Sequence, residues 1–127
     1  MRKLNLGEKF EEIAPQAFDG CQNLTQIIVD NRNKNFKTID GVLYSADMKT
    51  LICCPRAKTG VFKIPRSVIY IADYAFYNCS SLTSISIPSS VTYIGSYAFY
   101  NCRLVESLTL PKTLSSIGEG AFSSCIK

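Results

Sequence analysis

The sequence contains no histidine and no tryptophan. The absence of histidine excludes a Ser-His-Asp triad, a Cys-His dyad and any zinc site with a histidine ligand. A cysteine nucleophile would lack its usual base. These absences argue against an enzyme, and we expect no catalytic residues, no cofactor and no metal site.

Long apolar segments are missing as well, because no run approaches the ~18 residues that a membrane-spanning helix needs. Met1-Arg2-Lys3 leads into the polar stretch LNLGEKFEE rather than into the apolar core of a signal peptide. We therefore expect no membrane span and no signal peptide in this chain. Its 127 residues suit a single domain.

Positive charge is concentrated in one segment. The chain has 14 Lys and Arg against 10 Asp and Glu, and eight of these cations fall between residues 30 and 66. They form either a basic face for an acidic partner, with Lys34, Lys37 and Lys58 as candidate contacts, or a solvated loop that aids solubility. No aromatic residues alternate with the cations, so we do not expect nucleic acid as the partner. The eight are Arg32, Lys34, Lys37, Lys49, Arg56, Lys58, Lys63 and Arg66.

A repeat accounts for most of the remaining sequence. Four segments align: LGEKFEEIAPQAFDGC from Leu6, IPRSVIYIADYAFYNC from Ile64, IPSSVTYIGSYAFYNC from Ile87 and LPKTLSSIGEGAFSSC from Leu110. The last three recur every 23 residues, and the middle two agree at 12 of 16 positions. A fixed period of this length is typical of a solenoid, in which each unit buries its apolar face against the next unit.

Each unit holds a short alternating segment, such as Ile85-Ser86-Ile87, that we interpret as a strand with its outer two side chains inward. Proline follows three of these segments directly and should end the strands there. The Ala-Phe pair of each unit, such as Ala98-Phe99, is expected in a short helical turn, with the phenylalanine in the core. We predict five parallel strands in one ladder, at residues 4–6, 27–29, 62–64, 85–87 and 108–110.

Two sets of side chains are candidates for partner binding. Six of the seven tyrosines form three columns in the two best-matched units, and we expect them on the surface, either as an interface or as rings that only cover each other. The outward central residues of the strands form the second candidate surface. The tyrosine pairs are Tyr70 with Tyr93, Tyr74 with Tyr97, and Tyr77 with Tyr100; the strand candidates are Ile28, Lys63, Ser86 and Thr109.

Four of the six cysteines share one register, three residues after each repeat phenylalanine. Side chains that stack in parallel are poorly placed for a disulfide, and a small buried thiol fits such a row. We therefore expect free thiols. The four are Cys21, Cys79, Cys102 and Cys125.

At these positions the sequence resembles the BspA-type leucine-rich repeat family, whose units have Ile-Gly, Ala-Phe and Cys at the same spacing. The stretch from Asp40 through Pro55 resembles the longer unit of that family. The resemblance implies an α/β leucine-rich-repeat solenoid with a location at the cell surface or outside the cell, and a role in adhesion.

We expect residues 1–127 to form one solenoid of about five coils. The coils lie near 4–26, 27–61, 62–84, 85–107 and 108–127, and a β-hairpin at 40–55 is inserted in the second. The predicted function is a non-enzymatic binding module, part of a longer repeat protein, that recognises a protein partner or a host matrix component. A glycan ligand and end-to-end self-association stay open, and the alternative is an architectural spacer without a ligand.

Overall fold

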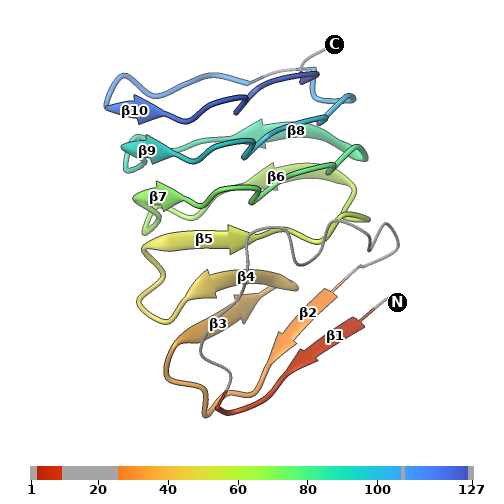
Figure 1. Cartoon of the computed structure of the whole chain (residues 1–127), viewed down its shortest axis with the longest axis vertical. Coiled ribbons are helices and arrows are strands. Elements are labelled where there is room, and N and C mark those ends of the chain that lie inside the picture. The colour runs from red at the N-terminus through yellow and green to blue at the C-terminus, as the bar shows by residue number, and fades with distance from the viewer. Residues whose placement is uncertain (1–2, 10–25, 107, 126–127) are drawn as a thin grey trace.

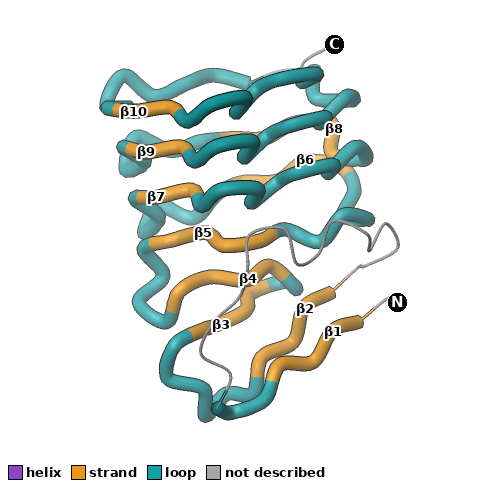
Figure 2. The backbone as a smooth tube through the Cα atoms, viewed as in Figure 1, coloured by secondary structure: helices purple, strands orange, loops and turns teal. Residues whose placement is uncertain are grey.

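The computed structural model describes residues 3–9, 26–106 and 108–125, and these residues form short strands joined by turns, with no helix among them (Figures 1 and 2). The strands stack along the long axis of the molecule, as a solenoid requires. They are β1 (Lys3–Leu6), β2 (Gln26–Val29), β3 (Phe36–Ile39), β4 (Val42–Ser45), β5 (Thr50–Cys53), β6 (Gly60–Lys63), β7 (Tyr70–Ile71), β8 (Leu82–Ser86), β9 (Tyr93–Ile94) and β10 (Ser116–Ile117).

The largest sheet has six strands in the order β10-β9-β7-β5-β4-β3. Strands β5, β7, β9 and β10 are parallel, with Tyr70 opposite Tyr93 and Ile71 opposite Ile94. Strands β3, β4 and β5 form an antiparallel meander. The predicted hairpin is therefore confirmed, and its second strand, β5, is also a strand of the solenoid sheet.

The predicted five-stranded ladder is wrong in two places. The parallel pairs β1–β2 and β6–β8 form as expected, but they are separate sheets. On the edge of β2 that faces away from β1, the Ile27 N–H donates to the carbonyl of Gly41 at 3.0 Å. The turn between β3 and β4 therefore lies where the next strand of the ladder was predicted. Residues 108–110 form no strand, and a pocket of about 320 Å³ is lined by Thr109 and Leu110 together with residues of β8.

The expected helical turn at the Ala-Phe pair is also wrong. Tyr74, Phe76 and Asn78 donate their N–H groups to carbonyls 22 residues further along, and the Phe76 bond to Ala98 measures 2.6 Å. The next coil repeats the pattern, with Phe99 donating to Ala121 at 2.8 Å. A helix needs these N–H groups for bonds within its own turn, so coil-to-coil bonding replaces the helix.

The core follows the sequence repeat. The ring of Phe99 is stacked between those of Phe76 and Phe122, at centroid distances of 4.9 and 5.3 Å. Phe62 meets Phe76 edge-on at 5.6 Å. Full burial of one such ring stabilises the fold by about 1.5–3 kcal/mol. The Ala17-Phe18 pair and Cys21 lie outside the described residues.

Candidate binding surface

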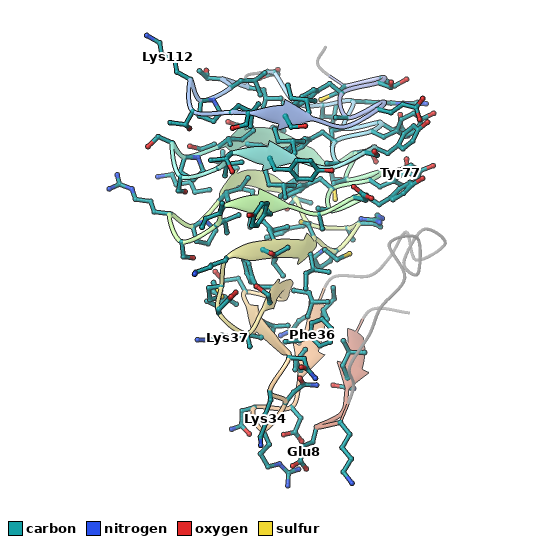
Figure 3. The ribbon with its side chains drawn as sticks, turned by 60° about the vertical axis from the view of Figure 1, so that its left-hand side comes forward. Glu8, Lys34, Phe36, Lys37, Tyr77 and Lys112 are labelled. Atoms are coloured by element: carbon teal, nitrogen blue, oxygen red, sulfur yellow. The ribbon has the colours of Figure 1, made fainter. Side chains whose placement is uncertain are left out.

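Four tyrosines form a compact cluster on the turns that follow β7 and β9. The Tyr74 and Tyr97 rings stack at 5.4 Å and the Tyr77 and Tyr100 rings at 5.0 Å, each ring lying on its counterpart in the next coil. Within each coil the two rings meet at an angle, at 5.2 and 5.8 Å. All four side chains are half-buried, and Figure 3 shows Tyr77 at the outer edge of the solenoid. We call these four residues the tyrosine cluster.

Tyr70 and Tyr93 form a separate pair. They lie opposite each other on β7 and β9, and their rings meet edge-on at 6.3 Å. Their exposed fractions are 48% and 36%, so they are the more exposed of the six predicted tyrosines. The structure thus brings the two rings of each predicted pair together, but it divides the three pairs between two places.

The backbone under the tyrosine cluster is in an unusual conformation. Tyr74 and Tyr97 have φ angles of 62° and 55°, in the left-handed region that bulky residues rarely adopt. The equivalent position in the next coil is Gly120, with φ of 64°, so the coil needs this conformation but not a tyrosine. A Cβ at Gly120 would collide with the Tyr97 ring, which shows that this ring occupies the space beside the glycine.

Polar side chains surround the rings. Asn101 donates an amide hydrogen to Asn78 at 2.9 Å, which joins a second column beside the tyrosines. Glu119 raises the pKa of the Tyr97 hydroxyl through its negative charge. The guanidinium of Arg56 lies 5.8 Å from the centre of the Tyr77 ring. Asn78 and Asn101 were not among the site residues predicted from the sequence. The available signal was the Asn-Cys pair that the two best-matched repeats share.

The strand candidates do not form one continuous surface. Lys63 and Ser86 lie opposite each other on β6 and β8, and both are exposed. Thr109 is exposed beyond β8, in the segment without a strand. Ile28 is half-buried on β2, in the separate sheet formed by β1 and β2.

The predicted basic face is also divided. Lys34 and Lys37 are exposed near β3, at the end of the molecule that holds Glu8 (Figure 3). Lys58 lies elsewhere, with its ammonium donating to the carbonyl of Asp40 at 3.1 Å. Arg56 is not on a face at all, because it is only 2% exposed and donates to the carbonyl of Cys54 at 3.0 Å. Its burial beneath the Tyr77 ring corrects the prediction for this residue.

The cysteine row is confirmed where it can be followed. Cys79 and Cys102 of the predicted row are buried free thiols, and Cys125 of the same row is half-buried. Cys54, which lies outside the predicted row, is a further buried free thiol. The Cys79 thiol lies 3.6 Å from the carbonyl of Cys54, and that of Cys102 lies 3.2 Å from the carbonyl of Phe76. Burial raises the pKa of the Cys54 thiol well above its ordinary value. Such thiols fill space in the core.

Within the described ranges, no group of three or more cysteine and acidic side chains is placed to hold a metal ion. The same ranges hold no helix of the length and apolarity that would cross a membrane.

Comparison with known proteins identifies the repeat. The sequence profile of the BspA type leucine rich repeat region, in six copies, matches residues 1–55 and 52–127. The chain belongs to this family. The BspA type match covers all four of the aligned sequence segments.

Solved structures of bacterial leucine-rich repeat proteins are similar to this chain. A leucine-rich repeat protein from Eubacterium ventriosum is 32% identical, with a TM-score of 0.81 over 92% of this chain and 32% of its own length. A leucine rich cell surface protein from Faecalibacterium prausnitzii is 30% identical, with a TM-score of 0.86 over 98% of this chain and 34% of its own.

The pneumococcal vaccine antigen PcpA shares the fold, with 24% identity and a TM-score of 0.70 over 93% of this chain and 35% of its own. The BspA type chain described here therefore spans about a third of the length of these structures. No curated protein matches it.

Proposed function

We propose that this segment is a non-enzymatic recognition module that binds a protein partner through the tyrosine cluster, as part of a longer protein at the cell surface. The location is supported by the similar leucine rich cell surface protein of Faecalibacterium prausnitzii. Tyrosine suits such a role, because its ring supplies rigid contact area and its hydroxyl a polar contact.

The observation that carries this proposal is the left-handed backbone at Tyr74 and Tyr97. A bulky residue in this region costs on the order of 1–3 kcal/mol, and Gly120 shows that the fold accepts glycine at the same position. Strained residues cluster at functional sites, since a residue that only filled space would be replaced there at a gain in stability. The strained backbone thus supports a role for the two rings in contact with a partner outside the coil.

A second candidate function is that of an architectural spacer. The mutual stacking of the rings favours it, because rings that cover each other lower the area open to a partner. A spacer predicts that no surface substitution changes binding, and it can be separated from a recognition module by experiment.

The test compares two double variants in biolayer interferometry against a panel of purified host matrix proteins and a glycan array. Tyr74→Ser with Tyr97→Ser should weaken binding to one panel protein by at least about tenfold, which corresponds to ~1.4 kcal/mol. The matched control is Tyr70→Ser with Tyr93→Ser, which removes the same groups from the separate pair and should leave binding unchanged.

Unchanged binding by the folded cluster variant would overturn the proposal. Absence of binding to any panel member would favour the spacer, and a response on the glycan array alone would replace the protein partner by a sugar.

A further inference from the structure

Strand β6 has a strand partner on only one of its two edges. Gly60–Lys63 pairs in parallel with β8, and within the described part of the chain no strand pairs with its opposite edge. Strand β2, which precedes it in the solenoid, pairs with β1 and with the Gly41 carbonyl instead. The ladder is interrupted at this point, and we call the edge of β6 that faces away from β8 the open edge, because no strand of the described residues pairs with it.

The main-chain groups on this open edge can be identified. Gly60 and Ile64 donate their N–H groups toward the β8 side, to Ser81 at 3.3 Å and to Ser86 at 3.0 Å. The pairing with β8 is regular from Val61 onward, and main-chain groups of successive residues in such a strand point to opposite edges. Because Ile64 donates toward β8, the main-chain groups of Val61 and Lys63 point away from it. The open edge therefore offers an N–H and a carbonyl from each of these two residues.

A pocket of about 830 Å³ borders the open edge. Gln26 and Asp40 line it from one side, and Lys58, Val61 and Lys63 line it from the other. Val61 is 63% exposed, which is the largest exposed fraction among the large apolar side chains of the described residues. An edge strand with an exposed apolar side chain and no partner is a template for a further strand.

The charges around the pocket favour a partner with an acidic side chain. Lys58 and Lys63 place two ammonium groups at its border, and Asp40 contributes one carboxylate. Lys58 is already tied to the Asp40 carbonyl, whereas Lys63 is exposed on the outer face of β6. Lys63 and Val61 are two residues apart, so their side chains stand on the same face of the strand.

We propose that the open edge of β6 captures an extended peptide as an added strand. An apolar side chain of the peptide lies against Val61, and an acidic side chain two positions away pairs with Lys63. Main-chain bonds to Val61 and Lys63 supply affinity, and the two side-chain contacts supply selectivity. This surface is distinct from the tyrosine cluster and acts independently of it.

The probe is the acetylated and amidated peptide Thr-Val-Thr-Glu-Thr, titrated into the ¹⁵N-labelled 127-residue chain and followed by NMR. The amide signals of Val61 and Lys63 should shift, and their hydrogen exchange should slow. A peptide of the same sequence that is methylated on the amide nitrogens facing β6 cannot complete the ladder. It should bind at least about fivefold more weakly, the equivalent of one lost hydrogen bond.

Two matched variants separate the main-chain contact from the side-chain contact. Val61→Pro removes the outward N–H and should weaken binding about fivefold or more, whereas Val61→Thr keeps the N–H and should bind within about twofold. Lys63→Glu should reverse selectivity, so that a peptide with lysine in place of glutamate binds better.

Three results would overturn the proposal: no shift at Val61 and Lys63, equal binding of the methylated peptide, or a heparin tetrasaccharide that produces the same shifts and is insensitive to Val61→Pro. The last result would show a simple anion site. If Val61→Pro does not fold, the methylated peptide and the Lys63→Glu reversal still decide. The variant Tyr74→Ser with Tyr97→Ser should bind the peptide normally, so the two proposals fail separately.

Discussion

Single residues set the distance between neighbouring coils. A Cβ at Gly95 would lie 2.5 Å from the Asp73 nitrogen and 2.7 Å from the Ala72 carbonyl carbon, and Gly118 faces the backbone of Gly95 and Ser96 in the same way. The Asp73 carboxylate is also in the way at Gly95, but the other obstructing atoms are backbone, which cannot move aside as a flexible side chain would. Gly95 and Gly118 therefore allow neighbouring coils to approach this closely.

We predict that Gly95→Ala destabilises the chain by about 1–3 kcal/mol, because the added methyl group pushes two backbones apart. Urea unfolding measures the change. The matched control is Gly7→Ala, since nothing lies within 4 Å of a Cβ there, and its effect should stay below about 1 kcal/mol. Equal effects of the two substitutions would contradict the close approach.

The strain at Tyr74 gives a second prediction at this scale. Tyr74→Gly and Tyr74→Ala both remove the ring, but only glycine adopts φ of 62° without a Cβ penalty. The glycine variant should therefore be more stable than the alanine variant by about 1–2 kcal/mol in thermal unfolding. An alanine variant of equal or higher stability would remove the argument from strain.

At the scale of the element, the solenoid is held by columns that cross from coil to coil. The Phe76–Phe99–Phe122 stack is one, and the bonds from Phe76 to Ala98 and from Phe99 to Ala121 are another. Phe99 has a ring on each side, whereas Phe122 is only partly buried.

Phe99→Ala should cost about 3–5 kcal/mol, because it leaves a cavity between two rings. Phe122→Ala should cost less, since its ring has a single stacked neighbour and is partly open to solvent. Denaturant unfolding of both variants checks the order. A larger loss of stability for Phe122→Ala than for Phe99→Ala would contradict the greater contribution expected of the central ring.

The elements also show how far sequence reasoning reaches. The phenylalanine stack and the cysteine row were predictable, because the 23-residue repeat fixes which residues meet. The hairpin lies outside the repeat and was predictable from two apolar runs, residues 42–44 and 51–53, on either side of a short polar loop. The six-stranded sheet was not, since strands of two residues such as Tyr70–Ile71 are too short for alternation to show. The turns at Tyr74 and Tyr97 were misread because their backbone bonds go to another coil, and local sequence does not report such bonds.

The candidate site was foreseen in the same uneven way. The two best-matched repeats predicted which tyrosines pair, but the separation of Tyr70 and Tyr93 from the cluster depends on where the chain turns after β7 and β9. The burial of Arg56 and the open edge of β6 arise where the hairpin meets the solenoid, and there the repeat no longer applies.

At the scale of the whole molecule, stability is distributed as in a one-dimensional array, in which each coil contacts only its neighbours. The Phe76 N–H donates to Ala98, whose coil is covered on both sides, whereas the Phe99 N–H donates to Ala121 in the last described coil. In that coil Ile117 is 46% exposed, and Leu110, which leads into it, is 41% exposed.

We predict that the Phe76 amide of the 127-residue chain exchanges its hydrogen at least about tenfold more slowly than the Phe99 amide, a difference of ~1.4 kcal/mol in opening free energy. Hydrogen exchange followed by NMR checks this order. Identical rates under native conditions would indicate that the coils open together rather than one at a time.

The bonds between coils run along the long axis, across the direction of strands β5, β7, β9 and β10. A pull on the two termini would therefore break the bonds between coils one after another rather than all at once in shear. Such a chain yields under small tension and lengthens in steps of one winding. If it links a cell to a surface, it would act as an extensible tether that absorbs a sudden load.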